Sequence, residues 1–336
     1  MNHATDRTPQ TAEPLQFVAD LLGNISEPNP GVRTVIEPAD AAQLIAEETR
    51  SRIAAVLEKF GGTPAVLLSG GVDSIYVAAV SVALGAEPIA VTVVTDGQSD
   101  EANATAAAHA LDLRHEVVRL SAPEVAELSR DVMQRLGTCE LWEVTAGIPL
   151  VAARRSFETI ADLGAILGGS GADAILGGGR KLTHPATSPE ACVELDQIIR
   201  TETAANFRYD RLVPGFYPAL LDEYADRLIH VFQTVRWWQI AESFAPQVLF
   251  GDHNGRPVDK LALRLACATQ LPSAAKHLAW GAKSPIQRSS GLMAALTTAA
   301  RAYAANLPGA QTYTDPMSED AEAVAVRLYL SLLEKS

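Results

Sequence analysis

The chain has 336 residues, of which 48% are hydrophobic, and its formal net charge is −13. This length and composition are sufficient for a large core and predict two domains, or one large α/β domain with a second lobe. The acidic balance argues against nucleic acid as a partner, because contacts to phosphates need lysine and arginine.

The three cysteines, Cys139, Cys192 and Cys267, form no CxxC pair and no cluster with histidine. Their spacing argues against a structural zinc site and against a disulfide framework. The N-terminus has no basic stretch followed by an apolar core, so no signal peptide is expected. No run of about 18 apolar residues occurs, so no membrane span is expected. We therefore expect a cytoplasmic protein.

The apolar pattern divides the chain into three parts. Residues 1–35 are predicted to form a loose N-terminal arm. Residues 36–185 alternate short apolar runs with helical patterns, which predicts an α/β domain with a parallel sheet and helices on both of its faces. Residues 186–336 show helical patterns and no convincing strand series, which predicts a mainly helical C-terminal lobe that contacts the substrate.

Within the α/β part, apolar and β-branched runs predict four strands, and helices are expected before, between and after them. The expected strands are 65–68, 88–95, 115–120 and 165–167. The expected helices are 40–60, 74–84, 99–111, 123–136 and 149–163.

The most informative segment is Ser69-Gly-Gly-Val-Asp-Ser74, which follows an expected buried strand and opens a helix. Two glycines allow the backbone to approach a ligand closely, and successive N–H groups at a helix start form an anion-binding nest. Ser69 and Ser74 can donate hydrogen bonds to phosphate oxygens. Asp73 would repel phosphate, so we expect it to hold Mg²⁺ that bridges carboxylate and pyrophosphate. The alternative is an ordinary turn in which serine and aspartate cap the helix.

A second block, Gly168–Gly178, has the sequence Gly-Gly-Ser-Gly-Ala-Asp-Ala-Ile-Leu-Gly-Gly. With the first block, it resembles the synthetase domain of the asparagine synthetase and β-lactam synthetase family, a branch of the pyrophosphate-loop (PP-loop) ATP pyrophosphatases. The distance in sequence between the two blocks also fits that family. So do two further strings, Asp100-Glu101-Ala102 and His115-Glu116. The resemblance is good over residues 50–180 and looser to about residue 300. It implies a PP-loop fold with ATP and Mg²⁺ as cofactors.

The resemblance also assigns ligand roles. Asp173 matches the second Mg²⁺-binding aspartate of the family, so Asp73 and Asp173 would hold the metal together. Leu67, Leu68 and Val91 are equally well explained as strand core, and the register decides which leucine faces the ligand. The implied nucleotide-binding residues are Leu67, Leu68, Ser69, Gly70, Gly71, Val72, Asp73, Ser74, Val91 and Gly169.

A lysine loop at Trp280–Gly291 resembles the family segment whose lysine stabilises charge during adenylation and amide formation. The resemblance makes Lys283 the catalytic lysine, although the arginine and phenylalanine of the family pattern are missing here. Lys276 is the competing candidate. The string Arg256-Pro-Val-Asp259 is a shortened version of another family motif, and we assign it no catalytic role.

Two departures from the family bear on the reaction. Residue 2 is Asn and no glutaminase domain with a cysteine nucleophile precedes the loop, so nitrogen is expected as ammonia, as a substrate amine or from a partner subunit. Ser170 stands where asparagine synthetases carry a glutamate that helps to activate the nitrogen. A serine hydroxyl is a weak base at neutral pH, so Ser170 remains a candidate catalytic position for a specialised amide, lactam or related C–N bond.

The resulting hypothesis is an AMP- and PPi-forming ligase that adenylates a carboxylate and joins it to an amine or ammonia. A chain that stops at the adenylate and passes it on is a variant of this hypothesis. The expected partners are small molecules, with no nucleic acid and no membrane, and the assembly is left open between a homodimer and a complex with a partner protein. Arg154, Arg155 and Arg208 are candidates for binding the carboxylate, or else form structural ion pairs.

Two alternative functions remain open. One is a PP-loop sulfur transferase, with Cys139 or Cys192 near the nucleotide. The other is a non-catalytic nucleotide-binding subunit, which the serine at position 170 and the incomplete lysine loop would suit.

Overall fold

A computed structural model of the chain describes residues 30–95, 99–206, 213, 215–281 and 290–335. Lys283, Arg208 and most of the predicted N-terminal arm lie outside these residues. Within the described part of the chain, no helix is both long and apolar enough to cross a membrane.

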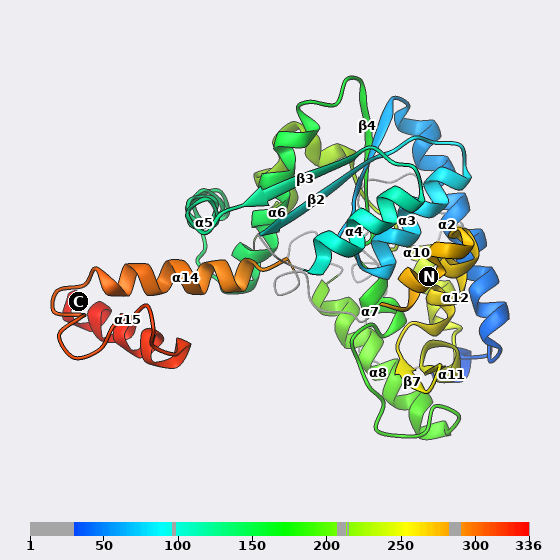
Figure 1. Cartoon of the computed structure of the whole chain (residues 1–336). Coiled ribbons are helices and arrows are strands. Elements are labelled where there is room, and N and C mark those ends of the chain that lie inside the picture. Colours follow the sequence, from blue (N-terminus) through cyan, green and yellow to red (C-terminus); the bar gives the residue numbers. More distant parts are fainter. Residues whose placement is uncertain (1–29, 96–98, 207–212, 214, 282–289, 336) are drawn as a thin grey trace, which may run out of the picture.

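A five-stranded, fully parallel sheet lies at the centre of the fold, with the strand order β3-β2-β1-β4-β5 (Figure 1). The strands are β1 (Thr63–Leu67), β2 (Ile89–Thr95), β3 (His115–Leu120), β4 (Leu163–Gly168) and β5 (Leu228–His230). The chain runs outward from β1 to β3 and then returns to place β4 on the other side of β1. Such a reversal opens a crevice beyond the carboxyl ends of the two strands, where open α/β sheets bind ligands.

Helices cover both faces of this sheet and form two separate apolar cores. One core contains residues of α2 (Pro38–Phe60), α3 (Val72–Ala83), α4 (Ser99–Ala110), α10 (Val235–Glu242) and α12 (Leu261–Gln270). The other contains residues of α5 (Ala122–Leu136), α6 (Leu141–Phe157), α9 (Phe216–Leu221) and α14 (Leu292–Ala305). The α/β fold with a parallel sheet and helices on both faces is therefore confirmed.

Local signals explain why the elements of the α/β part lie close to their expected positions. In α5, Ser121 accepts the N–H of Glu124 while the Glu124 side chain accepts the N–H of Ser121. This capping box stabilises a helix by about 1 kcal/mol. Gly137 ends the same helix with φ of 65°, a left-handed conformation that glycine adopts without steric cost.

The expected helix at 149–163 is wrong in its position, because α6 runs from Leu141 to Phe157. Glu140 caps its start by accepting the N–H groups of Trp142 and Glu143. Pro149 lies inside the helix, where proline is normally disfavoured, and its presence concealed the true start.

The expected absence of a strand series over residues 186–336 overlooked three short strands in a region that is otherwise mainly helical. β5 pairs with β4 at the edge of the sheet, and β6 (Gly251–His253) forms a hairpin with β7 (Arg256–Val258). Each of these strands has three residues, which is too short for an alternating pattern to identify a strand. The proposed boundary between residues 185 and 186 stays a prediction.

The remaining C-terminal elements are helical, as expected for this region. They include α8 (Pro189–Asn206), α11 (Pro246–Leu249) and α15 (Ala321–Lys335), with 3₁₀ turns η2 (Asp222–Arg227) and η3 (Ser273–Trp280). The short helix α7 (Ala172–Leu176) follows β4, and a 3₁₀ turn η1 (Pro30–Val32) precedes α2. Figure 1 shows α14 extending away from the sheet. The C-terminal helix α15 packs against α14.

Gly164 allows the turn before β1 to approach β4, which gives a test of the fold. A Cβ at this position would lie 2.1 Å from the carbonyl oxygen of Gly61. We expect Gly164→Ala to lower the free energy of unfolding by about 1–3 kcal/mol, as overpacking does, measured by urea denaturation. Gly31→Ala is the control, because its Cβ would have no neighbour within 4 Å. Equal denaturation midpoints for the two variants would contradict the expectation.

Candidate functional site

The PP-loop sequence forms a tight turn from β1 into α3 at the carboxyl end of β1, the strand that pairs with β4. Gly70 has φ of 75°, in the left-handed region that favours glycine. Gly71 is the N-cap of α3. The first amides of a helix lack intrahelical acceptors, and the positive end of the helix dipole lies there. This turn is therefore suited to bind an anion such as pyrophosphate.

The two serine hydroxyls of the loop bond to the loop itself. Ser74 Oγ donates to the carbonyl of Gly71 at 3.0 Å and accepts the N–H of Ser69 at 3.0 Å. Ser69 Oγ lies 3.1 Å from Ser74 Oγ. These bonds fix the turn in the absence of a ligand. The role of Ser69 and Ser74 as phosphate donors stays a prediction, and it requires at least one hydroxyl to turn toward the ligand.

Gly169 brings the second block directly against the loop, and Gly178 allows a close turn within that block around Asp173. A Cβ at Gly169 would lie 2.9 Å from both the carbonyl carbon of Asp73 and the backbone nitrogen of Ser74. A Cβ at Gly178 would lie 1.9 Å from Asp173 Oδ1. Only glycine permits both approaches without movement of the neighbouring atoms. The two blocks, about 100 residues apart in sequence, therefore form one site.

Asp73 and Asp173 converge on the ammonium group of Lys260. Lys260 Nζ donates to Asp73 Oδ1 at 2.6 Å, to Asp73 Oδ2 at 2.8 Å and to Asp173 Oδ1 at 2.9 Å. The lysine side chain is fully buried, whereas those of Asp73 and Asp173 are 16% and 44% exposed. The sequence analysis did not identify Lys260. The one sequence feature that could have pointed to Lys260 is its position directly after the shortened family motif Arg256–Asp259.

The backbone around Lys260 is fixed by its neighbours. Lys260 has φ of 50° at the start of α12, which is uncommon for a residue other than glycine. Asp259 accepts the N–H of Gly179 and a bond from Arg264 Nη2 at 2.7 Å. Burial alone would raise the pKa of Asp259, but the Gly179 N–H and the charges of Arg264 and Lys260 hold that pKa below its usual value. The carboxylate therefore stays charged and anchors the turn that carries Lys260.

The carboxylate pair fits the expected Mg²⁺. Both side chains already point at a single cation, the Lys260 ammonium. In the described part of the chain, no cluster of three or more acidic, histidine or cysteine side chains could hold a metal. Mg²⁺ in nucleotide sites is commonly bound by one or two carboxylates, with phosphate oxygens and water as the other ligands. Asp73 and Asp173 would hold the ion in that way.

Comparison with known proteins agrees with this geometry. The asparagine synthase family profile matches residues 61–237, slightly more than half of the chain. The chain belongs to the asparagine synthase family. The matched region contains the PP-loop, Asp73 and Asp173, and it supports an ATP-using synthetase of the amidating or ligase type.

Similarity to individual proteins is distant. No curated protein matches the sequence significantly. Among solved structures, NMN synthetase from Francisella tularensis is 16% identical, with a TM-score of 0.31. The match covers 42% of this chain and 58% of that chain. A similarity at this level says nothing about the substrate of this family member.

Ser170, which takes the position of the family glutamate, has a neutral partner. It lies beyond the carboxyl end of β4 and is exposed, and Gln233 Nε2 donates to its Oγ at 3.4 Å. Gln233 follows β5 and is buried, at 4% exposure. An amide and a hydroxyl do not act as bases at neutral pH. Sequence analysis did not find Gln233, because its contact with Ser170 depends on the pairing of β4 with β5.

The apolar residues among the predicted nucleotide-binding positions divide between the two faces of the sheet. Leu67 pairs with Val91 in the register of β1 and β2, and both contribute to the core formed with α5 and α6. Leu68 and Val72 belong to the opposite core, at 1% and 5% exposure. A role in nucleotide binding for these four residues stays a prediction.

The predicted lysine loop is described only at its ends. Lys283 lies outside the described residues, whereas the competing candidate Lys276 is exposed on η3. Gly281, just before the gap, accepts a bond from Arg264 Nη1 at 3.0 Å. Ser290, just after it, accepts the N–H of Thr95 at 2.8 Å at the carboxyl end of β2. Both flanks are therefore attached to elements at or beside the site.

The arginine candidates that are described form ion pairs. Arg154 Nη1 lies 2.6 Å from Asp222 Oδ2, and Arg155 Nη1 lies 3.6 Å from Glu124 Oε1. These contacts support the structural interpretation of Arg154 and Arg155.

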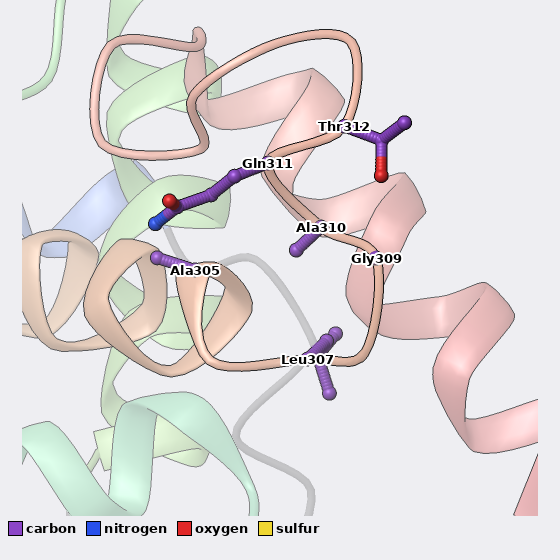
Figure 2. Close-up of a pocket in the computed structure, with 6 residues that line it drawn as sticks. All are labelled: Ala305, Leu307, Gly309, Ala310, Gln311 and Thr312. Carbon is purple, nitrogen blue, oxygen red and sulfur yellow. The ribbon is translucent and has the colours of Figure 1, made fainter.

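Two surface hollows lie away from the carboxylates. Figure 2 shows the first, between α14 and α15, which Ala305, Leu307, Gly309, Ala310, Gln311 and Thr312 line without a charged side chain. The second adjoins the amino ends of β1 and β2 and includes Gly62, Thr63, Gly85 and Glu87. That edge is opposite to the one where parallel sheets bind ligands.

Adjacent glycines test the close contact between the two blocks. We expect Gly169→Ala to weaken binding of Mg·ATP by roughly tenfold or more, because relief of the clash must displace the start of α3. Isothermal titration calorimetry measures the affinity. Gly168→Ala is the matched control, since its Cβ would make only an ordinary 3.8 Å contact with the Ile229 carbonyl oxygen. Equal affinities for the two variants would show that the contact has no effect on binding.

Proposed function

We propose that this chain is an ATP-dependent, AMP- and PPi-forming ligase that adenylates a carboxylate and forms an amide or related C–N bond. The observation that carries the proposal is the convergence of the Ser69–Ser74 turn, Asp73 and Asp173 at the carboxyl ends of β1 and β4. An anion nest beside two carboxylates suits a nucleotide whose phosphates arrive with a divalent cation.

In the first step, an oxygen of the substrate carboxylate attacks the α-phosphorus of ATP. The bond between that phosphorus and the bridging oxygen breaks, and pyrophosphate leaves with the electron pair. The amides at the start of α3 would bind the departing anion, and Mg²⁺, when bound, neutralises its charge. The contribution of the chain is to position the reactants and to provide an electrostatic site arranged before the reaction.

In the second step, a neutral nitrogen attacks the acyl carbon, the bond between that carbon and the phosphate oxygen breaks, and AMP leaves with the electron pair. The proton that the nitrogen loses goes to the departing phosphate or to water. Ser170 and Gln233 offer hydrogen bonds to the reacting groups but no base. A nitrogen that is already neutral, or a base supplied by the substrate, fits this arrangement better than an alkylammonium ion does. Lys283 is proposed to stabilise the negative charge that develops in both steps, and the attachment of both flanks of its loop at or beside the site supports this role.

A sulfur transferase has less support. Cys139 is exposed and Cys192 is half-buried on α8. Burial, and to a lesser extent the negative charge of the nearby Asp73, raises the pKa of the Cys267 thiol to about 12. A thiol that stays protonated at neutral pH is a poor nucleophile. A non-catalytic subunit would not need Asp73 and Asp173 for chemistry. The presence of both carboxylates therefore favours an enzyme.

Pyrophosphate exchange tests adenylation directly. With ATP, Mg²⁺ and pooled carboxylic and amino acids, we expect incorporation of labelled PPi into ATP that depends on one acid. Asp73→Asn should lower exchange by at least ~100-fold, because it removes a proposed metal ligand. The exposed Asp226→Asn should exchange like the wild type. If the wild type binds ATP and yet gives no exchange with any acid, alone or with amines, the ligase proposal fails and the non-catalytic subunit gains support.

A pair of lysine variants tests the assignment of the catalytic lysine. We expect Lys283→Ala to lower kcat of exchange by roughly 100-fold to 1,000-fold with a small change in KM, as for loss of a group that acts in the transition state. Lys276→Ala should have less than about a threefold effect on either constant, since single surface changes are usually mild. The reverse pattern would transfer the role to Lys276.

A further inference from the structure

Lys260 occupies the point at which the two proposed metal ligands meet. Its ammonium makes three bonds of 2.6–2.9 Å to Asp73 and Asp173, and no part of its side chain is exposed to solvent. A buried charge is stable only when it is paired. The site therefore contains a cation of its own, the Lys260 ammonium.

The charges at this point change the way in which a divalent ion would bind. Two carboxylates and one ammonium have a summed charge of −1, from −2 and +1. A divalent ion would bring the sum to +1 and would lie beside the ammonium in a partly buried setting, where repulsion is stronger than in water. The phosphates of a nucleotide bring enough negative charge for both cations to be held together.

We infer that Lys260 excludes free divalent metal from the nucleotide-free site and turns its ammonium to the phosphates when nucleotide enters. The ligand of this site is then a metal–nucleotide complex bound as one unit, and Lys260 is the residue that sets this requirement. The inference rests on the proposed function, because it takes the Ser69–Ser74 turn as the phosphate site.

The local structure suits such a change of partner. The lysine side chain is a flexible stem that carries a point charge, so its head can move while its backbone stays in place. The Asp259–Arg264 contacts hold that backbone. Asp173, at 44% exposure, is the more open of the two carboxylates, so a metal–nucleotide complex can reach it from solvent.

Equilibrium dialysis with Mn²⁺ tests the inference on the full chain. We expect the wild type to retain little Mn²⁺ alone and to retain it with α,β-methylene ATP. Lys260→Met should raise the Mn²⁺ affinity without nucleotide by roughly tenfold to a hundredfold, the range of effects seen beside metal ligands. Lys260→Arg keeps the charge and should remain as weak as the wild type. Adding Asp173→Asn to Lys260→Met should abolish the gain and so locate the metal.

The control is Lys59→Met, which removes an exposed lysine at the end of α2 and should leave Mn²⁺ binding unchanged. Equal Mn²⁺ retention by the wild type with and without the analogue overturns the inference, as does a folded Lys260→Met that gains no affinity. If Lys260→Met does not fold, as judged by circular dichroism, the wild-type comparison decides alone. Failure of the proposed function looks different: the wild type would then give no pyrophosphate exchange, or would not bind the analogue, while Lys260→Met still gained Mn²⁺ affinity without nucleotide.

Discussion

The ion contacts among Asp73, Asp173 and Lys260 hold the candidate site together. Each residue comes from a different element: Asp73 from α3, Asp173 from α7 and Lys260 from the start of α12. The buried ammonium of Lys260 is costly to remove from water, and loss of its carboxylate partners would leave it uncompensated. The three elements are therefore constrained to stay together, and the PP-loop leads directly into one of them, α3.

The same constraint connects the fold to the proposed chemistry. The reversal of the sheet between β1 and β4 opens the crevice, and Gly169 lets the second block lie against the loop. Asp259 then fixes the turn that carries Lys260 across that crevice. An anion nest, two carboxylates and a lysine thus meet at one end of the sheet, which is the arrangement expected for binding a metal-bound pyrophosphate group.

Neutral groups occupy position 170, at the carboxyl end of β4. Where a base would activate nitrogen, Ser170 bonds to the amide of Gln233. Such a pair can orient a substrate but cannot take up a proton at neutral pH. We therefore propose that the chain catalyses adenylation, and that the nitrogen substrate arrives neutral or carries its own base.

The sequence by itself determined the parallel α/β core and its strands β1 to β4, and it singled out the PP-loop string and the two aspartates, because these depend on local patterns and short motifs. It misplaced the start of α6, where Pro149 is tolerated inside a helix, and it missed β5, whose three residues have no periodic pattern. Only the tertiary structure revealed Lys260 and Gln233. Their contacts join residues that are 63 to 187 positions apart, and such contacts depend on how the strands and helices pack rather than on any local pattern.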